Sequence, residues 1–212
     1  KAYKSAELGG LPLVDPIPPG HENPLSTYDG LRTISQQLNT TVRNIDKLTI
    51  CAINGVAIQT GFSLALSCDF RIASENARMG SATLRFGLLP DEGGQYLLVR
   101  LLGVARAMEF MMRKQIIMAD QAMELGLVNQ VVPADQLESE TMALASELAD
   151  GPQVSMRLLK KSILNAAELS WEHALDEIAS KTAISDHHSD AKEGVAAFHD
   201  KREAKFNDWL ES

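Results

Sequence analysis

Apolar side chains recur at every third or fourth position between residues 28 and 45, which predicts an amphipathic helix there. The pattern then changes to a short apolar run at 48–53 that is rich in β-branched residues and predicts a buried strand. Residues 70–73 predict a second strand, and small apolar residues at 62–67 predict a short buried helix between the two. Five prolines and three glycines within residues 1–25 predict a surface loop.

Helical spacing dominates the rest of the chain. A helix is expected to open at Asp91 and to end before Gly103, because glycine commonly follows the last helical residue. A brief strand is expected at 127–132. Further helices are expected at 105–113, 119–125, 134–149, 152–167, 171–185 and from Asp190 past Phe206. Buried strands followed by helices indicate a layered α/β core with a helical extension.

Composition narrows the function classes. The chain has 212 residues, 45% of them hydrophobic, which is enough for one well-cored domain. A net charge of −8 disfavours a nucleic-acid partner, which needs clustered basic surface, but leaves room for a small phosphorylated ligand. No apolar run is long enough to span a membrane, so no membrane partner is expected. Cys51 and Cys68 lie in apolar segments, which favours reduced thiols and a cytoplasmic location.

Metal and nucleophile motifs are missing from the sequence. His187 and His188 are adjacent and cannot share a metal on one helix face, and the other three histidines belong to no metal-ligand motif, so no metal is expected. No Gly-x-Ser-x-Gly elbow, Walker loop or dinucleotide fingerprint occurs either.

One candidate site is the segment 52–69, AINGVAIQTGFSLALSCD, where a strand leads through a short loop into a helix. The first amides of a helix lack internal acceptors and carry partial positive charge. They can stabilise a carbonyl oxygen that becomes negative during a reaction. The alternative is that Gly55 and Gly61 only permit tight packing between strand and helix.

A second candidate is the segment 79–100, MGSATLRFGLLPDEGGQYLLVR, in which Asp91 and Glu92 follow a proline and precede two glycines. The two acids are expected either to cap the helix or to serve as a general base or acid beside a cavity. The adjacent glycines indicate that a partner helix or a ligand approaches the backbone closely.

Together these segments resemble the enoyl-CoA hydratase/isomerase (crotonase) family. AINGVAIQTGFSLALSCDFRIAS resembles its A-x-N-G turn, short helix and Cys-Asp pair, and FGLLPDEGGQYLLVRLLGVARAMEF resembles its next block. ADQAMELGLVNQVVP and EGVAAFHDKREAKF resemble two later blocks, and the four occur in family order over residues 25–207. The resemblance implies a spiral core of β-β-α units in residues 1–133, with a variable loop at 1–25, and a helical trimerisation region in 134–212.

The resemblance also implies a homotrimer or a dimer of trimers that binds an acyl-CoA thioester. Coenzyme A is then part of the substrate, and no separate cofactor is needed. The family's Gly-Gly-Gly turn reads Gln59-Thr60-Gly61 here, so the resemblance assigns one oxyanion amide to Thr60. Ala57, Gln59 and Gly61 are expected to line the substrate site. The other oxyanion amide and the first strands are expected upstream of Lys1.

The chain departs from the hydratase pattern at two positions. Ser63 and Thr83 stand where hydratases carry the two glutamates that handle water and the α-proton. Neither hydroxyl is a competent base at neutral pH. Some family branches, including isomerases and a dehalogenase, place their carboxylate after the proline. This ranks Asp91 first and Glu92 second as the proton-transfer group.

We therefore expect an enoyl-CoA hydratase/isomerase family enzyme that forms a thioester enolate and works with a single carboxylate, as an isomerase does. The alternatives are an acyl-CoA-binding homologue without activity, and a thioester hydrolase or dehalogenase that uses Asp91. The C-terminal signature includes Phe198 and Lys201, which the family uses to contact coenzyme A. Packing between helices is an equal alternative for Phe198.

Overall fold

The computed structural model describes residues 23–210. Residues 1–22 of the loop expected over 1–25 lie outside the described part of the chain. A helix already begins at Pro24. The helix expected at 28–45 is confirmed as three consecutive helical segments. They are α2 (Pro24–Gly30), the π-helical segment η1 (Leu31–Ser35) and α3 (Gln36–Arg43).

Six short strands form two three-stranded sheets. The strands are β1 (Ile50–Ile53), β2 (Val56–Ile58), β3 (Phe70–Ser74), β4 (Arg78–Gly80), β5 (Ile116–Met118) and β6 (Gln130–Val132). One sheet has the order β1-β3-β6 and the other β2-β4-β5. All pairs are parallel except β4 with β5. From β1 to β4, consecutive strands thus lie in different sheets, and the β1-β2-α4 unit is repeated by β3-β4-α5.

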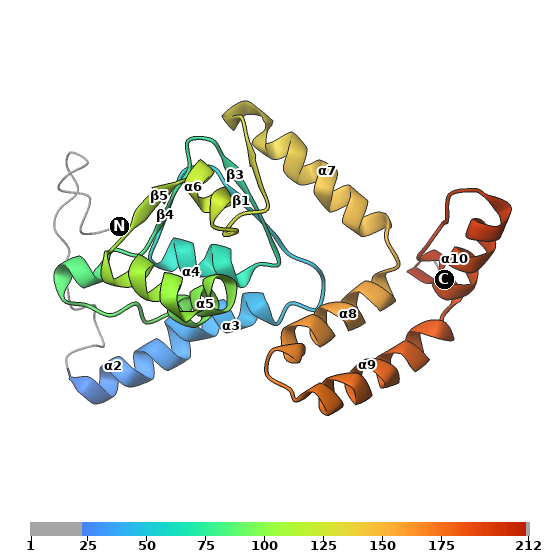
Figure 1. The fold of residues 1–212 in the computed structure, drawn as a ribbon, viewed down its shortest axis with the longest axis horizontal. Coiled ribbons are helices and arrows are strands. Elements are labelled where there is room, and N and C mark those ends of the chain that lie inside the picture. Colours follow the sequence, from blue (N-terminus) through green and yellow to red (C-terminus); the bar gives the residue numbers. More distant parts are fainter. Residues whose placement is uncertain (1–22, 211–212) are drawn as a thin grey trace.

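Two helices follow these strand pairs and fill the core. They are α4 (Thr60–Ser67) and α5 (Gly94–Met112). Phe62 of α4 stacks on Phe110 of α5 with ring centroids 5.8 Å apart, and both side chains are buried. In Figure 1 these two helices lie between the strands and α3. The start of α4 is thereby held on a rigid support.

The contact between α3 and α4 includes a buried polar pair. Ser67 Oγ donates to Asn39 Oδ1 at 3.1 Å, and Asn39 is the one buried residue of α3. Tyr28 and Ile34, which contribute to the periodicity of this segment, are 59% and 70% exposed. The apolar pattern therefore predicts the helix correctly, but it does not mark the face that contacts α4.

The C-terminal half is helical, as expected. Its helices are α6 (Ala119–Glu124), α7 (Leu137–Asp150), α8 (Gln153–Ala166), α9 (Trp171–Asp186) and α10 (Ser189–Asp200), with the single turns η3 (Ala134–Gln136) and η4 (Asp208–Leu210). A further single turn, η2 (Thr83–Phe86), lies between β4 and α5. Figure 1 shows α8, α9 and α10 extending away from the strands. No helix within residues 23–210 has the length and apolar character that crossing a bilayer requires.

Two expected boundaries are wrong, and one is confirmed. The helix expected to open at Asp91 begins at Gly94, because Gly93 adopts φ 90° and ends the preceding turn. The end expected before Gly103 is confirmed, because Gly103 is non-helical at φ 74° and ψ 165° and separates the two helical stretches that together make up α5. The last helix stops at Asp200, because Lys201 takes a left-handed conformation at φ 54°.

Candidate active site

Thr60 is the first residue of α4, so the amide that the resemblance assigns to the oxyanion site lies at the start of a helix. Its amide has no acceptor within the helix and carries part of the positive end of the helix dipole. The turn before it is fixed by Gln59 N donating to Gly80 O at 3.0 Å and by Ser63 N donating to Gln59 O at 2.8 Å. An oxygen placed at this turn would meet a donor held in a rigid frame.

Gln59 has an unusual backbone conformation, with φ 55° and ψ −108°. A residue other than glycine costs about 1–3 kcal/mol in such a region, and such strain is concentrated at functional sites. The side chain of Gln59 is half-buried and bonded at both ends, to Glu92 on one side and to Ser81 and Thr83 on the other.

Glu92 lies against the start of α4. Its side chain is buried, with 6% of the residue exposed, and it accepts a short hydrogen bond from Thr60 Oγ1. Its other oxygen accepts from Gln59 Nε2 at 2.9 Å. The structure therefore brings together two segments that are 32 residues apart in sequence.

Asp91 is half-buried in the turn that precedes α5. Its backbone carbonyl accepts from Gln36 Nε2 at 3.1 Å, which ties this turn to α3. Neither Asp91 nor Glu92 lies in the first turn of α5, and Gly93 occupies the N-cap position. Neither acid therefore occupies the N-cap position itself.

The two glycines after Glu92 have different tasks. Gly93 supplies the positive φ, and Gly94 permits close approach of α5 to α4. A Cβ added to Gly94 would lie 2.4 Å from Ser63 Oγ. Ser63 is 2% exposed, so the position at which hydratases carry a glutamate is sealed by the start of α5.

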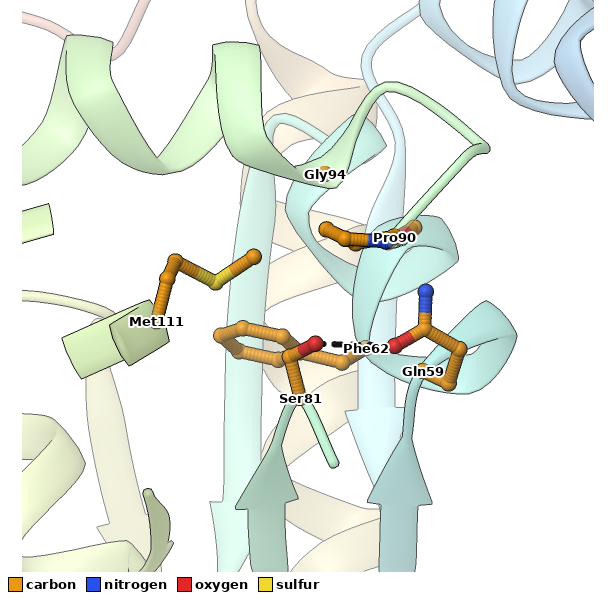
Figure 2. Close-up of a pocket in the computed structure, with 7 residues that line it drawn as sticks. Gln59, Phe62, Ser81, Pro90, Gly94 and Met111 are labelled. Carbon is orange, nitrogen blue, oxygen red and sulfur yellow. Dashed lines mark hydrogen bonds between the residues drawn. The ribbon is translucent and has the colours of Figure 1, made fainter. Parts of the chain in front are cut away.

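A small cavity adjoins this contact. It encloses about 10 Å³, room for about one water molecule, and is lined by Gln59, Phe62, Ser63, Ser81, Pro90, Gly94 and Met111. Figure 2 shows the Gln59 side chain reaching Ser81 across it, with Met111 and Phe62 forming an apolar wall.

A larger open hollow of about 380 Å³ lies between β1 and α7. It is lined by Ala52, Asn54, Leu137, Glu138, Thr141 and Met142. None of the residues expected in the site borders it.

The other expected site residues fall in two places. Ala57 lies on β2, and a Cβ added to Gly61 would lie 3.9 Å from the Ala57 Cβ, so both border the Thr60 turn. Phe198, which is 85% exposed, and Lys201 lie at the end of α10. Figure 1 places α10 far from α4, so one chain does not bring Phe198 and Lys201 to this turn.

Sequence reasoning missed Ser81 as a member of the site. It follows β4 directly, and its hydroxyl donates to Gln59 Oε1 at 2.8 Å. Within the described part of the chain, no group of three or more histidine, cysteine or acidic residues is arranged to hold a metal ion.

Comparison with known proteins defines the family. The sequence profile of the enoyl-CoA hydratase/isomerase family matches residues 19–209. The 1,2-epoxyphenylacetyl-CoA isomerase of Escherichia coli K12 is 35% identical over 196 residues, which is 91% of this chain and 72% of that protein. The crotonyl-CoA hydratase of Syntrophomonas wolfei is 33% identical over 82% of this chain and 66% of its own length.

Solved structures agree with the sequence comparison. The crystal structure of an enoyl-CoA hydratase from Bacillus anthracis matches with a TM-score of 0.81 and 33% identity, over 87% of this chain and 71% of that one. The chain belongs to the enoyl-CoA hydratase/isomerase family. The crotonase fold that was expected from the sequence is thereby confirmed. The chain spans only about two thirds of the length of the Syntrophomonas relative.

Proposed function

We propose that this chain acts on an acyl-CoA thioester and isomerises it through an enolate, using Asp91 as its single proton-transfer group. The amide of Thr60 would hold the thioester oxygen, where negative charge develops. Asp91 would take a proton from the α-carbon and return it at the γ-carbon, which moves the double bond without adding water. The family membership supports an acyl-CoA substrate, and the relative named 1,2-epoxyphenylacetyl-CoA isomerase indicates that the family includes isomerases as well as hydratases.

The contact between Glu92 and the Gln59-Thr60 turn carries the proposal. Glu92 binds the side chains of both Gln59 and Thr60, so the adjacent Asp91 belongs to a turn that rests on the start of α4. A carboxylate near a helix N-terminus is the minimum that enolate chemistry needs. Coenzyme A would be part of the substrate, and the chemistry calls for no metal or redox cofactor.

Hydration is less well supported by the geometry. It requires a second acid or base to activate water, and Ser63 and Thr83 occupy the two positions that carry these groups in hydratases. Ser63 is also sealed beneath Gly94. Thr83 donates to Gln59 Oε1 at 3.2 Å and is therefore already used to hold a neighbouring side chain.

The direct test is an assay of the purified protein with 3-hexenoyl-CoA and, separately, with 2-hexenoyl-CoA in water. We expect conversion of the first to the conjugated thioester, seen by ultraviolet absorbance, and little hydration of the second. Hydration at a comparable rate would contradict the proposal. Binding of both thioesters without turnover would favour the inactive homologue, and a covalent adduct at Asp91 in the mass spectrum would favour the hydrolase or dehalogenase.

We also propose that the helices after Pro133 form the contact between subunits of a trimer. This proposal is supported by exposed apolar side chains on these helices, because an extensive exposed apolar surface marks an interaction site. The series consists of Leu159, Ile163, Leu175, Ile184, Val195 and Phe198. Light scattering on the purified protein would test it, since a monomer at micromolar concentration contradicts the proposal.

A further inference from the structure

The side chains of Gln59 and Glu92 form a closed hydrogen-bond arrangement beside Thr60. Thr60 Oγ1 donates to Glu92 Oε1, and Gln59 Nε2 donates to Glu92 Oε2 at 2.9 Å. Both oxygens of a carboxylate that is only 6% exposed are therefore occupied by neutral donors. A buried carboxylate bonded in this way holds its neighbours in place.

The orientation of the Gln59 amide follows from its partners. Its Oε1 accepts from Ser81 Oγ at 2.8 Å and from Thr83 Oγ1 at 3.2 Å. An ionised carboxylate can only accept, so the NH₂ group of Gln59 has to face Glu92. The chain tolerates φ 55° at Gln59 to keep this side chain in place, whereas the glycine of the family pattern would have no side chain there.

We infer that Gln59 and Glu92 act as a latch that fixes the distance between the Thr60 amide and Asp91. Each latch residue is the direct sequence neighbour of one of the two reacting groups. Gln59 precedes Thr60, and Glu92 follows Asp91. Opening the latch would let the turn before α5 move away from α4. Glu92 is then a positioning residue rather than the proton-transfer group. This inference rests on the proposed function of Asp91 and Thr60.

The two latch residues can be exchanged, which provides a sharp test. Gln59→Glu alone sets two carboxylates against each other and opens the latch. The double variant Gln59→Glu/Glu92→Gln restores one amide and one carboxylate, keeps the net charge of the wild type, and leaves acceptors for Ser81, Thr83 and Thr60. The measurement is exchange of the α-protons of hexanoyl-CoA in D₂O, followed by mass spectrometry, together with isomerisation of 3-hexenoyl-CoA.

We expect Gln59→Glu to lower kcat by about 10- to 100-fold, because a displacement of about 1 Å has this effect, with KM changed less than about threefold. The double variant should recover kcat to within about fivefold of the wild type. Recovery distinguishes positioning from proton transfer, because a glutamine at position 92 cannot serve as a base. Thr83→Val removes the hydroxyl that binds Gln59 and should lower kcat by less than Gln59→Glu does, whereas Thr83→Ser keeps the hydroxyl and should leave kcat unchanged. This pair of variants tests the latch even if Gln59→Glu fails to fold.

A matched control lies in the other sheet. Gln130 Nε2 donates to Glu140 Oε2 at 3.4 Å, so Gln130→Glu creates a similar pair of carboxylates away from α4 and should leave kcat unchanged. Full activity of Gln59→Glu would overturn the latch. A double variant as inactive as Asp91→Asn would overturn it too, by placing Glu92 in the chemistry. Absence of both exchange and isomerisation in the wild type would instead overturn the proposed function, and the latch with it.

Discussion

Lys160 Nζ lies 2.7 Å from Asp69 Oδ2 and joins α8 to the residue that precedes β3. The ammonium group also donates to the backbone carbonyls of Ile45 and Lys47 at 2.8 and 2.9 Å. The same Asp69 oxygen accepts from Thr49 N at 2.7 Å. One buried cation therefore connects a C-terminal helix with the segments on both sides of β1.

Lys160→Met should destabilise the protein by about 3–5 kcal/mol, because it leaves the Asp69 carboxylate with no cationic partner in a largely buried place. Only 5% of the Lys160 side chain and 16% of the Asp69 side chain are exposed. Urea denaturation followed by circular dichroism would measure the change. Lys161→Met is the matched control, since that side chain is 61% exposed, and it should change stability by less than about 1 kcal/mol. Equal effects of the two variants would contradict the assignment.

Gly94→Ala should destabilise the fold by about 1–3 kcal/mol, the usual effect of overpacking. The new methyl group would lie 2.4 Å from Ser63 Oγ, and α5 would have to shift away from α4. Thermal unfolding would report the loss. Gly55→Ala meets no atom within 4 Å and should behave almost as the wild type does. An unchanged melting temperature of Gly94→Ala would show that the two helices are not held in this contact.

Asp91→Asn should lower the isomerisation of 3-hexenoyl-CoA by about 10²- to 10⁴-fold, the range typical of a lost general base. Binding of coenzyme A, measured by calorimetry, should not change, because asparagine keeps the size of the side chain. Asp120→Asn on α6 serves as the control for loss of a surface acid near a helix start. An active Asp91→Asn protein would sink the assignment of Asp91 as the proton-transfer group.

Cys68 should react with iodoacetamide at lower pH than an ordinary cysteine. Its pKa is lowered from 9.0 to about 7, chiefly by the hydrogen bond with the Cys51 side chain and against the effect of burial. The same contact raises the pKa of Cys51, which stays a thiol. Since the thiolate is the reactive form, labelling of Cys68 should rise through pH 7. Cys51→Ala should move this rise upward, and half-maximal labelling near pH 9.0 in the wild type would contradict it.

Most of the fold was predictable from periodicity, and the exceptions share a cause. The helices from α7 to α10 are long enough to repeat an apolar stripe, and β1 and β3 form continuous runs. By contrast β2, β4 and β5 have three residues each, too few to show an alternation. β2 and β4 exist because β1 and β3 each continue, after a short turn, into the second sheet, and β5 exists because it pairs with β4. That arrangement is a property of the spiral and not of the local sequence.

The site was predictable only in part. The turn at Thr60 and the acids after Pro90 stand in recognisable motifs. The bonds of Glu92 to Gln59 and Thr60 join segments 33 and 32 residues apart, and no local pattern announces them. Ser81 gave no signal because a single serine after a strand is common. Gln59 did give a sequence signal, because it replaces a glycine of the family pattern. The positive φ of Gln59 explains why glycine is usual at this position.

The contact of Gly94 with Ser63 bears on how this protein can change in evolution. A glutamate at position 63 would need space that the neighbouring cavity of about 10 Å³ does not offer. Selection acting on one codon at a time would first meet an unstable intermediate, and the start of α5 would have to move as well. Position 63 and the start of α5 are therefore coupled, so that a larger side chain at position 63 is compatible with this fold only together with a change where α5 packs on α4.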